Sequence, residues 1–336
     1  MKKIRVIQIG TSHAHALGAL GTLRELDSVF ELVAVAEPDA SAREKLANHP
    51  AFSGLHICDV EEALSLPDLD AAVIEVAEKD LCHYAKLAAE RGLHIQMDKP
   101  GGENYTEFAQ MIDLLREKNL VFQPGYMYRF NPAVQKALEL VHSGELGDIF
   151  SVEAQMSIDM GDHRDPLLSK FQGGMMYFLG CHLVDLLYQI SGTPQQVFPF
   201  LRSLRGASSD FGMAVYTYEK GVSFLKTCGA ELNGFLRRQL VITGTLGTVE
   251  IKPLELFQIE DPQYLETSLR LTLKKDHPHA NFDGAKCFTF PRYRRYDAMF
   301  LHFARMIQGL AKPICSYEQE LELFGLVLES SGIPLQ

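Results

Sequence analysis

The chain has 336 residues, of which 46% are apolar and 22% are charged. This is an ordinary globular composition, and at roughly 150 residues per domain it predicts two domains. The formal net charge of −11 argues against nucleic acid and anionic membranes as partners. Six unclustered cysteines argue against a disulfide framework. No apolar run is long enough for a signal sequence or a membrane span, so we expect a soluble, cytoplasmic protein.

The first half of the chain alternates between strand and helix patterns. Strands are expected over residues 4–9, 30–36, 55–58, 71–76, 93–97 and 120–123, and helices over 17–26, 40–47, 60–66, 79–91 and 105–118. Strands that are apolar on both faces and alternate with helices are typical of a parallel sheet covered on both sides. We therefore predict an α/β fold that begins with a doubly wound parallel-sheet domain over residues 1–124.

The second half has a different pattern. A helix over 131–142 precedes a strand over 148–160, in which apolar and polar residues alternate. Further strands are expected over 196–204, 212–219, 222–230, 239–243, 248–252 and 268–273, and helices over 175–190, 296–308 and 317–331. Runs of strands separated from helices predict an α+β domain with a large open, mostly antiparallel sheet over residues 125–336.

The loop after the first strand reads Gly10-Thr11-Ser12-His13-Ala14-His15. It keeps only the first glycine of the dinucleotide fingerprint G-x-G-x-x-G, although Glu37 stands where an acid can hydrogen-bond a ribose. Two interpretations remain open: the loop binds a dinucleotide through backbone N–H groups, or Ser12 and His15 cap the helix and no cofactor binds. The Glu37 charge favours NAD over NADP, whereas nearby Arg43 leaves NADP open.

Histidines also raise the question of a metal site. His13 and His15 form an H-x-H pair, and His163, His182, His277 and His279 follow in the second half. Imidazole suits zinc and similar ions. Because no carboxylate or thiolate spacing supports such a site, we expect no metal.

Three motifs together carry a family resemblance. They are His94-Ile95-Gln96-Met97-Asp98-Lys99-Pro100, Gly125-Tyr126-Met127-Tyr128-Arg129-Phe130-Asn131-Pro132, and Gly173-Gly174-Met175-Met176-Tyr177-Phe178-Leu179-Gly180-Cys181-His182-Leu183-Val184-Asp185. In this order the chain resembles the glucose–fructose oxidoreductase, inositol dehydrogenase and rhizopine-catabolism family, Gfo/Idh/MocA. The resemblance implies an N-terminal Rossmann domain that binds NAD(P), and a C-terminal sheet that forms homodimers or homotetramers.

The resemblance also assigns residues. It implies that Lys99 and His182 are catalytic, Lys99 by orienting the reacting hydroxyl and His182 as acid and base. The cofactor contacts that we expect are Gly10, Thr11, Ser12, His13, His15, Glu37, Ala77, Asp98, Lys99 and Pro100. The substrate contacts that we expect are Lys99, Tyr128, Arg129, Tyr177, Phe178 and His182. Asp185 is expected to be structural, as a partner of Arg129 or a capping group.

The chain departs from the family pattern at several of these positions. Phe178 stands where the family has an aspartate that shares in proton handling, so Tyr128 or Tyr177 would have to supply a hydroxyl. The usual T-P dipeptide is Val76-Ala77, and the acid before Lys99 is Asp98 rather than glutamate. We interpret the chain as a divergent member.

The resemblance implies an NAD(P)-dependent oxidoreductase that acts on a sugar, cyclitol or related polyol or ketone. Phe178 keeps a second interpretation open, a sugar lyase, hydrolase or isomerase that uses bound NAD transiently. The altered loop and the missing aspartate keep a third open, a non-catalytic protein that binds a dinucleotide or a sugar.

Overall fold

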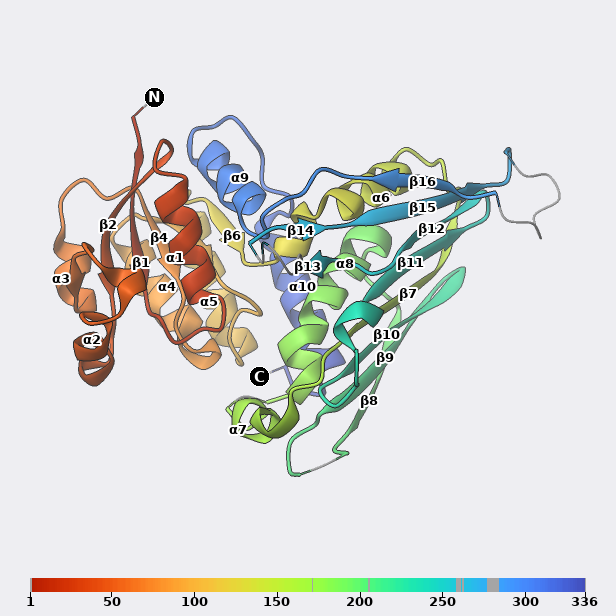
Figure 1. Cartoon of the computed structure of the whole chain (residues 1–336), viewed down its shortest axis with the longest axis horizontal. Coiled ribbons are helices and arrows are strands. Elements are labelled where there is room, and N and C mark those ends of the chain that lie inside the picture. The colour runs from red at the N-terminus through yellow and green to blue at the C-terminus, as the bar shows by residue number, and fades with distance from the viewer. Residues whose placement is uncertain are drawn as a thin grey trace. The chain divides into compact units, whose positions relative to one another are not determined.

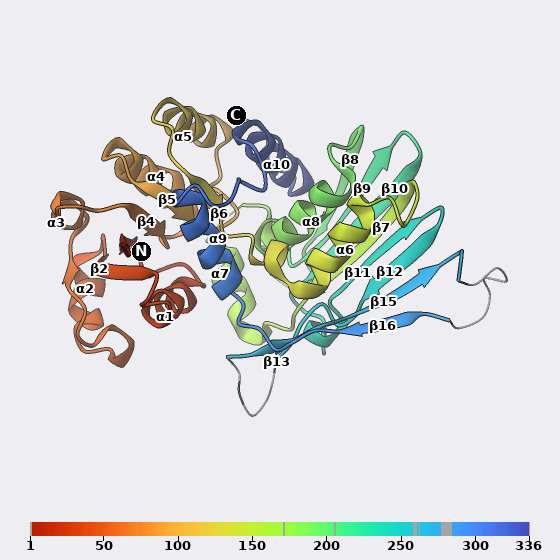
Figure 2. The ribbon, with the colours of Figure 1, turned by 90° about the horizontal axis from the view of Figure 1, so that it is seen from above.

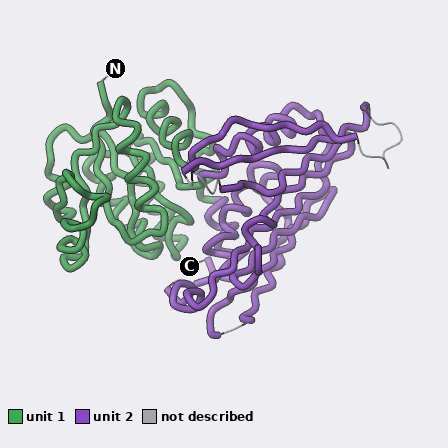
Figure 3. The backbone as a smooth tube through the Cα atoms, viewed as in Figure 1, with its two compact units in different colours: residues 1–126, 296–321, 336 green, residues 127–295, 322–335 purple. Residues whose placement is uncertain are grey.

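The computed structural model describes residues 2–170, 172–204, 206–257, 261, 263–276 and 284–335. The chain divides into two compact units (Figure 3). Unit 1 comprises the chain up to Tyr126 and the segment Tyr296–Leu321, and unit 2 comprises Met127–Arg295 and Glu322–Leu335. We predicted a boundary between two independently folding domains after residue 124, and this boundary stays a prediction.

Unit 1 is built on a six-stranded sheet with the order β3-β2-β1-β4-β5-β6. Its strands are β1 (Ile4–Ile9), β2 (Phe30–Ala36), β3 (Ile57–Cys58), β4 (Ala71–Ile74), β5 (His94–Met97) and β6 (Phe122–Pro124). Every neighbouring pair is parallel, which confirms the predicted doubly wound sheet. The strand order reverses between β1 and β4, and ligands of such sheets bind beyond the strand ends at that point.

Helices cover both faces of this sheet. They are α1 (Ala16–Glu25), α2 (Ala40–Leu46), α3 (Val60–Ser65), α4 (Leu81–Glu90) and α5 (Tyr105–Glu117). Figures 1 and 2 show α1 on one face and α4 on the other. All four residues of β4 are buried, because the apolar stripe of a helix covers each side of the strand.

The segment Tyr296–Leu321 packs with unit 1 although it lies far along the chain. It contains α9 (Asp297–Ile307). The Gln123 amide donates to the Met299 carbonyl at 2.9 Å, and the ring of Phe300 meets that of Phe30 edge-on, with centroids 6.2 Å apart. Local periodicity predicts such a helix but not the sheet against which it packs.

Unit 2 is built on an eight-stranded sheet with the order β16-β15-β12-β11-β7-β10-β9-β8. Its strands are β7 (Ile149–Ser157), β8 (Gln196–Arg202), β9 (Phe211–Tyr218), β10 (Gly221–Cys228), β11 (Gln239–Gly244), β12 (Gly247–Ile251), β15 (Ser268–Leu273) and β16 (Lys286–Thr289). Only β7 and β10 pair in parallel. The sheet is therefore mixed and mostly antiparallel, as predicted.

Helices lie on one face of this sheet. They are α6 (Pro132–His142), α7 (Arg164–Leu168), α8 (Cys181–Ser191) and the part of α10 (Tyr317–Ser330) that belongs to unit 2. Figure 2 shows α6 and α8 along the same face. The alternation in β7 fits this arrangement, because Val152, Ala154 and Met156 are buried. The opposite face carries exposed side chains of β8 and β10.

Three short strands were not predicted: β13 (Leu256–Phe257), β14 (Leu265–Glu266) and β16. They have two to four residues each, which is too few for a period of two to be recognised. Within the described residues, no helix has the length and apolar character needed to cross a membrane.

Candidate active site

The candidate site of unit 1 begins at Gly10, where β1 turns toward α1. Its φ is +89°, and a Cβ there would lie 2.4 Å from Cγ1 of Val76, so only glycine lets the loops after β1 and β4 approach so closely. The backbone N–H of Gly10 donates to the Ala36 carbonyl at 2.7 Å. This glycine therefore joins the ends of β1, β2 and β4.

The start of α1 bears on the two interpretations of the first loop. His15 is the N-cap residue, but its side chain makes no capping hydrogen bond, and Ser12 is exposed. The capping bond that one interpretation requires of His15 is therefore not formed, and whether the loop binds a dinucleotide stays a prediction. A helix start without a side-chain cap keeps N–H groups for an anionic ligand such as a phosphate.

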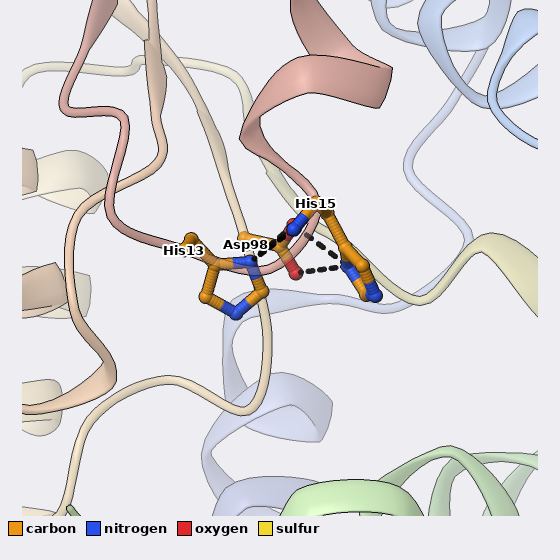
Figure 4. Close-up of side chains that lie close together, drawn as sticks. All are labelled: His13, His15 and Asp98. Atoms are coloured by element: carbon orange, nitrogen blue, oxygen red, sulfur yellow. Dashed lines mark hydrogen bonds and ion pairs between the residues drawn. The ribbon is translucent and has the colours of Figure 1, made fainter. Parts of the chain in front are cut away.

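The side chains of His13 and His15 meet the carboxylate of Asp98. Figure 4 shows the carboxylate between the two imidazoles. Asp98 Oδ2 lies 3.0 Å from Nδ1 of His15 and 3.1 Å from Nδ1 of His13. Two residues of the first loop are thus joined to the end of β5, a contact that the sequence does not predict.

Glu75 adds a second buried acid to this cluster. It follows β4 directly, is 3% exposed, and its Oε2 lies 3.6 Å from Nδ1 of His13. Burial raises the pKa of Glu75 well above its usual range, and the charge of Asp98 adds to this effect. Burial alone would raise the pKa of Asp98 too, but His13 and His15 outweigh it and hold that pKa well below its usual range. Glu75 therefore keeps its proton while Asp98 stays charged.

His15 is neutral at pH 7. Burial lowers its pKa from 6.5 to about 4, although the neighbouring Asp98 carboxylate acts in the opposite direction. Its imidazole therefore offers one lone pair and one N–H to its surroundings.

Lys99 follows Asp98 at the same edge and is only 1% exposed. Its backbone N–H donates to Oδ1 of Asp98 at 2.6 Å. Gly125, after β6, lies against this acid, since a Cβ there would come 2.8 Å from Oδ1 of Asp98. The Tyr126 hydroxyl donates to the Pro100 carbonyl at 3.3 Å. Neighbouring loops thus hold the Asp98-Lys99-Pro100 segment in place.

Glu37 lies at the end of β2, where the sequence places a ribose-binding acid. It is 4% exposed and accepts hydrogen bonds from the Thr11 hydroxyl at 2.5 Å and the Asp39 N–H at 3.1 Å. The Arg43 guanidinium donates to the Glu37 carbonyl at 2.7 Å. Ala77 follows β4 and precedes the short turn Glu78–Asp80.

The candidate site of unit 2 centres on His182, which is 1% exposed on α8. The ring of Tyr128 meets the imidazole edge-on, with centroids 5.1 Å apart. The Tyr128 hydroxyl donates to Glu255, and Arg238 and Arg295 both bind that carboxylate, at 3.1 and 2.7 Å. Burial and the Glu255 charge raise the pKa of Tyr128, so it keeps its proton.

Arg129 and Asp185 form the ion pair that we expected. Nε of Arg129 lies 2.8 Å from Oδ1 of Asp185, and both side chains are almost fully buried. Tyr177 is buried and Phe178 is half-buried in a π-helical turn, Met176–Gly180, that leads into α8. Such turns are frequent at functional sites.

Sequence reasoning missed Glu75, Arg238 and Glu255. The sequence does mark Glu75 as a candidate, because it is an acidic residue at the end of an otherwise apolar strand. It does not mark Arg238 and Glu255, because they meet only through the pairing of β11 and β12. His277 and His279 lie outside the described residues.

A doubly wound sheet with a buried acid after β2 and a buried lysine after β5 defines a nucleotide-binding α/β protein. A model of an oxidoreductase family with an NAD-binding Rossmann fold matches residues 4–126, and a model of the GFO/IDH/MocA C-terminal domain matches residues 134–250. The chain belongs to the Gfo/Idh/MocA oxidoreductase family, and the resemblance is confirmed.

Several relatives are dehydrogenases by name. D-xylose 1-dehydrogenase (NADP(+)) 2 from Haloferax volcanii is 29% identical over 202 residues, which cover 58% of this chain and 61% of the relative. Trans-1,2-dihydrobenzene-1,2-diol dehydrogenase from Bos taurus is 26% identical over 256 residues, covering 74% of this chain and 71% of the relative. Levoglucosan dehydrogenase from Pseudarthrobacter phenanthrenivorans is 30% identical over 135 residues, which cover 38% of this chain and 35% of the relative. In the first four curated relatives the match spans only 46% to 61% of the relative's length.

Solved structures share the fold over nearly the whole chain. An oxidoreductase from Thermotoga maritima has a TM-score of 0.79 at 20% identity, covering 99% of this chain and 97% of the other. A levoglucosan dehydrogenase in complex with NADH and levoglucosan has a TM-score of 0.79 at 18% identity, covering 98% of each chain.

The buried pair in unit 2 gives a prediction about stability. Replacing Asp185 by alanine strands the buried Arg129 charge, which should lower the free energy of unfolding by about 3–5 kcal/mol. Urea unfolding followed by circular dichroism measures this loss. The control is Asp113→Ala, which removes the exposed partner of Arg116 and should cost less than about 1 kcal/mol. Equal losses in the two variants would contradict a stabilising role for the buried pair.

Proposed function

We propose that the chain is an NAD(P)-dependent dehydrogenase or reductase of a sugar, cyclitol or related polyol or ketone. The observation that carries the proposal is Lys99, which is 1% exposed and whose backbone N–H donates to Asp98 at the carboxyl edge of the parallel sheet. Burying a charge is costly unless it is compensated. A buried lysine at the edge where such sheets bind ligands is well suited to hold the oxygen of a reacting carbon.

The residues of unit 1 fit the dinucleotide that the family implies. The close turn at Gly10 and the start of α1, where the His15 side chain makes no capping bond, suit a pyrophosphate, and Glu37 suits a ribose. We propose that the cofactor is held by Gly10, Thr11, Ser12, His13, His15, Glu37, Ala77, Asp98, Lys99 and Pro100. When bound, the nicotinamide supplies the acceptor or donor of a hydride.

Side chains of the chain itself would bind the reacting oxygen of the substrate and transfer its proton. The Lys99 ammonium donates to the reacting oxygen and stabilises negative charge on it. His182 takes the hydroxyl proton during oxidation and returns it during reduction. Tyr128, held by Glu255 and Arg238, keeps its own proton and packs against the His182 ring. We propose that Arg129, Tyr177 and Phe178 contact the substrate.

The relatives support an alcohol as the substrate. Dehydrogenases named for D-xylose, levoglucosan and a dihydrobenzene diol match parts of the chain. Because Phe178 replaces the family aspartate, we assign proton transfer to His182. An imidazole can perform this transfer near pH 7.

Lys99 provides the direct test of this mechanism. Lys99→Ala should lower kcat about 100-fold or more, because one preorganised electrostatic group is lost. The measurement is NADH formation over a panel of sugars and cyclitols. Lys220→Ala removes an exposed lysine and should leave kcat unchanged. Unchanged turnover in Lys99→Ala would refute the assignment, and substrate loss without net NADH formation would favour a lyase or isomerase.

Glu37 should set the cofactor preference toward NAD. Glu37→Ala removes the carboxylate that would repel a 2′-phosphate, and Arg43 remains nearby to bind it. We expect the ratio of the Kd for NADP to the Kd for NAD to fall about tenfold, equivalent to about 1.4 kcal/mol. Calorimetric titration of both nucleotides measures the ratio. Glu31→Ala, at the exposed start of β2, is the control, and tighter NADP binding by the unmodified chain would contradict the assignment.

We also propose a homodimer or homotetramer formed through the sheet of unit 2. On the face away from α6 and α8, Phe198 of β8 and Phe224 of β10 both align with Val215 of β9. Phe198, Phe200, Val222 and Phe224 are 37% to 52% exposed. A contiguous apolar patch of this kind favours an interface, and closed homo-oligomers bury the same patch on each copy.

The oligomer is tested at Phe224. Phe224→Asp places a charge in the patch and should reduce the assembly to protomers of 37.6 kDa, measured by light scattering after size-exclusion chromatography. Leu232→Asp changes an apolar residue that is 79% exposed outside the strands and should leave the mass unchanged. A monomeric unmodified chain, or a Phe224→Asp variant with unchanged mass, would refute the interface.

A cytoplasmic location is part of the same proposal. All six cysteines lie among the described residues and none forms a disulfide, and five of them are buried. Free thiols persist in reducing compartments.

A further inference from the structure

Four side chains converge beyond the ends of three neighbouring strands in unit 1. His13 and His15 follow β1, Glu75 follows β4, and Asp98 follows β5. One ligand atom from each of His13, His15 and Asp98 lies within 4.8 Å of the others. The three side chains are 16% exposed or less, so they turn inward rather than toward bulk water.

The distances suit a metal ion. Bonds of about 2.0–2.2 Å to histidine nitrogen or carboxylate oxygen place neighbouring donors about 3.0 Å apart in an octahedron and about 3.4 Å apart in a tetrahedron. Asp98 Oδ2 lies 3.0 Å from Nδ1 of His15 and 3.1 Å from Nδ1 of His13 (Figure 4). Both imidazoles therefore point the same nitrogen at one carboxylate oxygen.

Hydrogen bonding alone does not account for His13. Its Nδ1 accepts the backbone N–H of His15 at 3.2 Å and also lies 3.1 Å from the Asp98 carboxylate. A ring nitrogen has either a proton or a lone pair, so it cannot accept from one group and donate to the other at once. A positive charge between Nδ1 and the carboxylate oxygen removes the repulsion between their lone pairs.

Glu75 is an independent sign of a ligand. Among the described residues, its Oε2 has no hydrogen-bond partner, although the side chain is 3% exposed. The same atom lies 3.6 Å from Nδ1 of His13. A buried polar atom without a partner costs free energy, and a metal ion bound at Oε2 would take the place of the Glu75 proton.

We propose that His13, His15 and Asp98, with Glu75 as a fourth donor, bind one divalent transition-metal ion of the zinc class. Two imidazoles and two carboxylates are ligands that Zn²⁺ and its first-row neighbours accept. Binding of the ion would displace the Glu75 proton, and the two carboxylates would then exceed the single charge of Lys99. From the sequence we expected no metal, so the proposed site differs from that expectation. Metal binding at this site does not require a bound dinucleotide.

The test uses Zn²⁺ alone as the probe and the full chain. We expect calorimetric titration to give one tight Zn²⁺ site per chain, and His15→Gln to weaken it at least about 10-fold. A second cluster, His56, Cys58 and Glu62, offers the matched control. His56→Ala should leave the tight site intact.

X-ray absorption on the unmodified, Zn²⁺-loaded chain decides between the clusters without a variant. The proposed site has only nitrogen and oxygen donors at about 2.0–2.2 Å, whereas the second cluster adds a Cys58 sulfur at about 2.3 Å. Circular dichroism verifies that His15→Gln is folded. A sulfur ligand, loss of the site in His56→Ala, equal binding by folded His15→Gln, or no stoichiometric Zn²⁺ would each overturn the proposal.

Discussion

The candidate site of unit 1 depends on a carboxylate that stays charged although it is buried. Asp98 is 4% exposed, and burial alone would favour its neutral form. The imidazoles of His13 and His15 and the backbone N–H of Lys99 hold it ionised. This constraint fixes the loop after β1 to the end of β5, directly before the buried Lys99.

Unit 2 also contains a buried acid, and a different set of side chains compensates its charge. Glu255 is 1% exposed and is compensated by Arg238, Arg295 and the Tyr128 hydroxyl. The compensated acid keeps Tyr128 in one position against the His182 ring. In each unit, therefore, a buried and fully bonded acid positions the group to which we assign the chemistry, and the supporting side chains come from segments far apart in the chain.

Much of this was predictable from local patterns. The six parallel strands and the mixed second sheet follow from periodicity, and the Arg129–Asp185 pair was one of two roles expected for Asp185. The contact of His13 and His15 with Asp98 did not, because it joins residues more than 80 positions apart. Glu255 was equally hidden, since its partner Arg238 meets it only once β11 and β12 pair. Sequence patterns predict each helix or strand separately. The partners of a buried charge depend on how these elements pack together, which the patterns do not show.

Binding of the dinucleotide to unit 1 is the central claim, and calorimetric titration of the unmodified chain with NADH tests it most directly. We expect saturable binding of one NADH per chain with micromolar affinity, which corresponds to about −8 kcal/mol. Absence of heat and of saturation at millimolar NADH would contradict it and would favour a protein that has kept the fold without the cofactor.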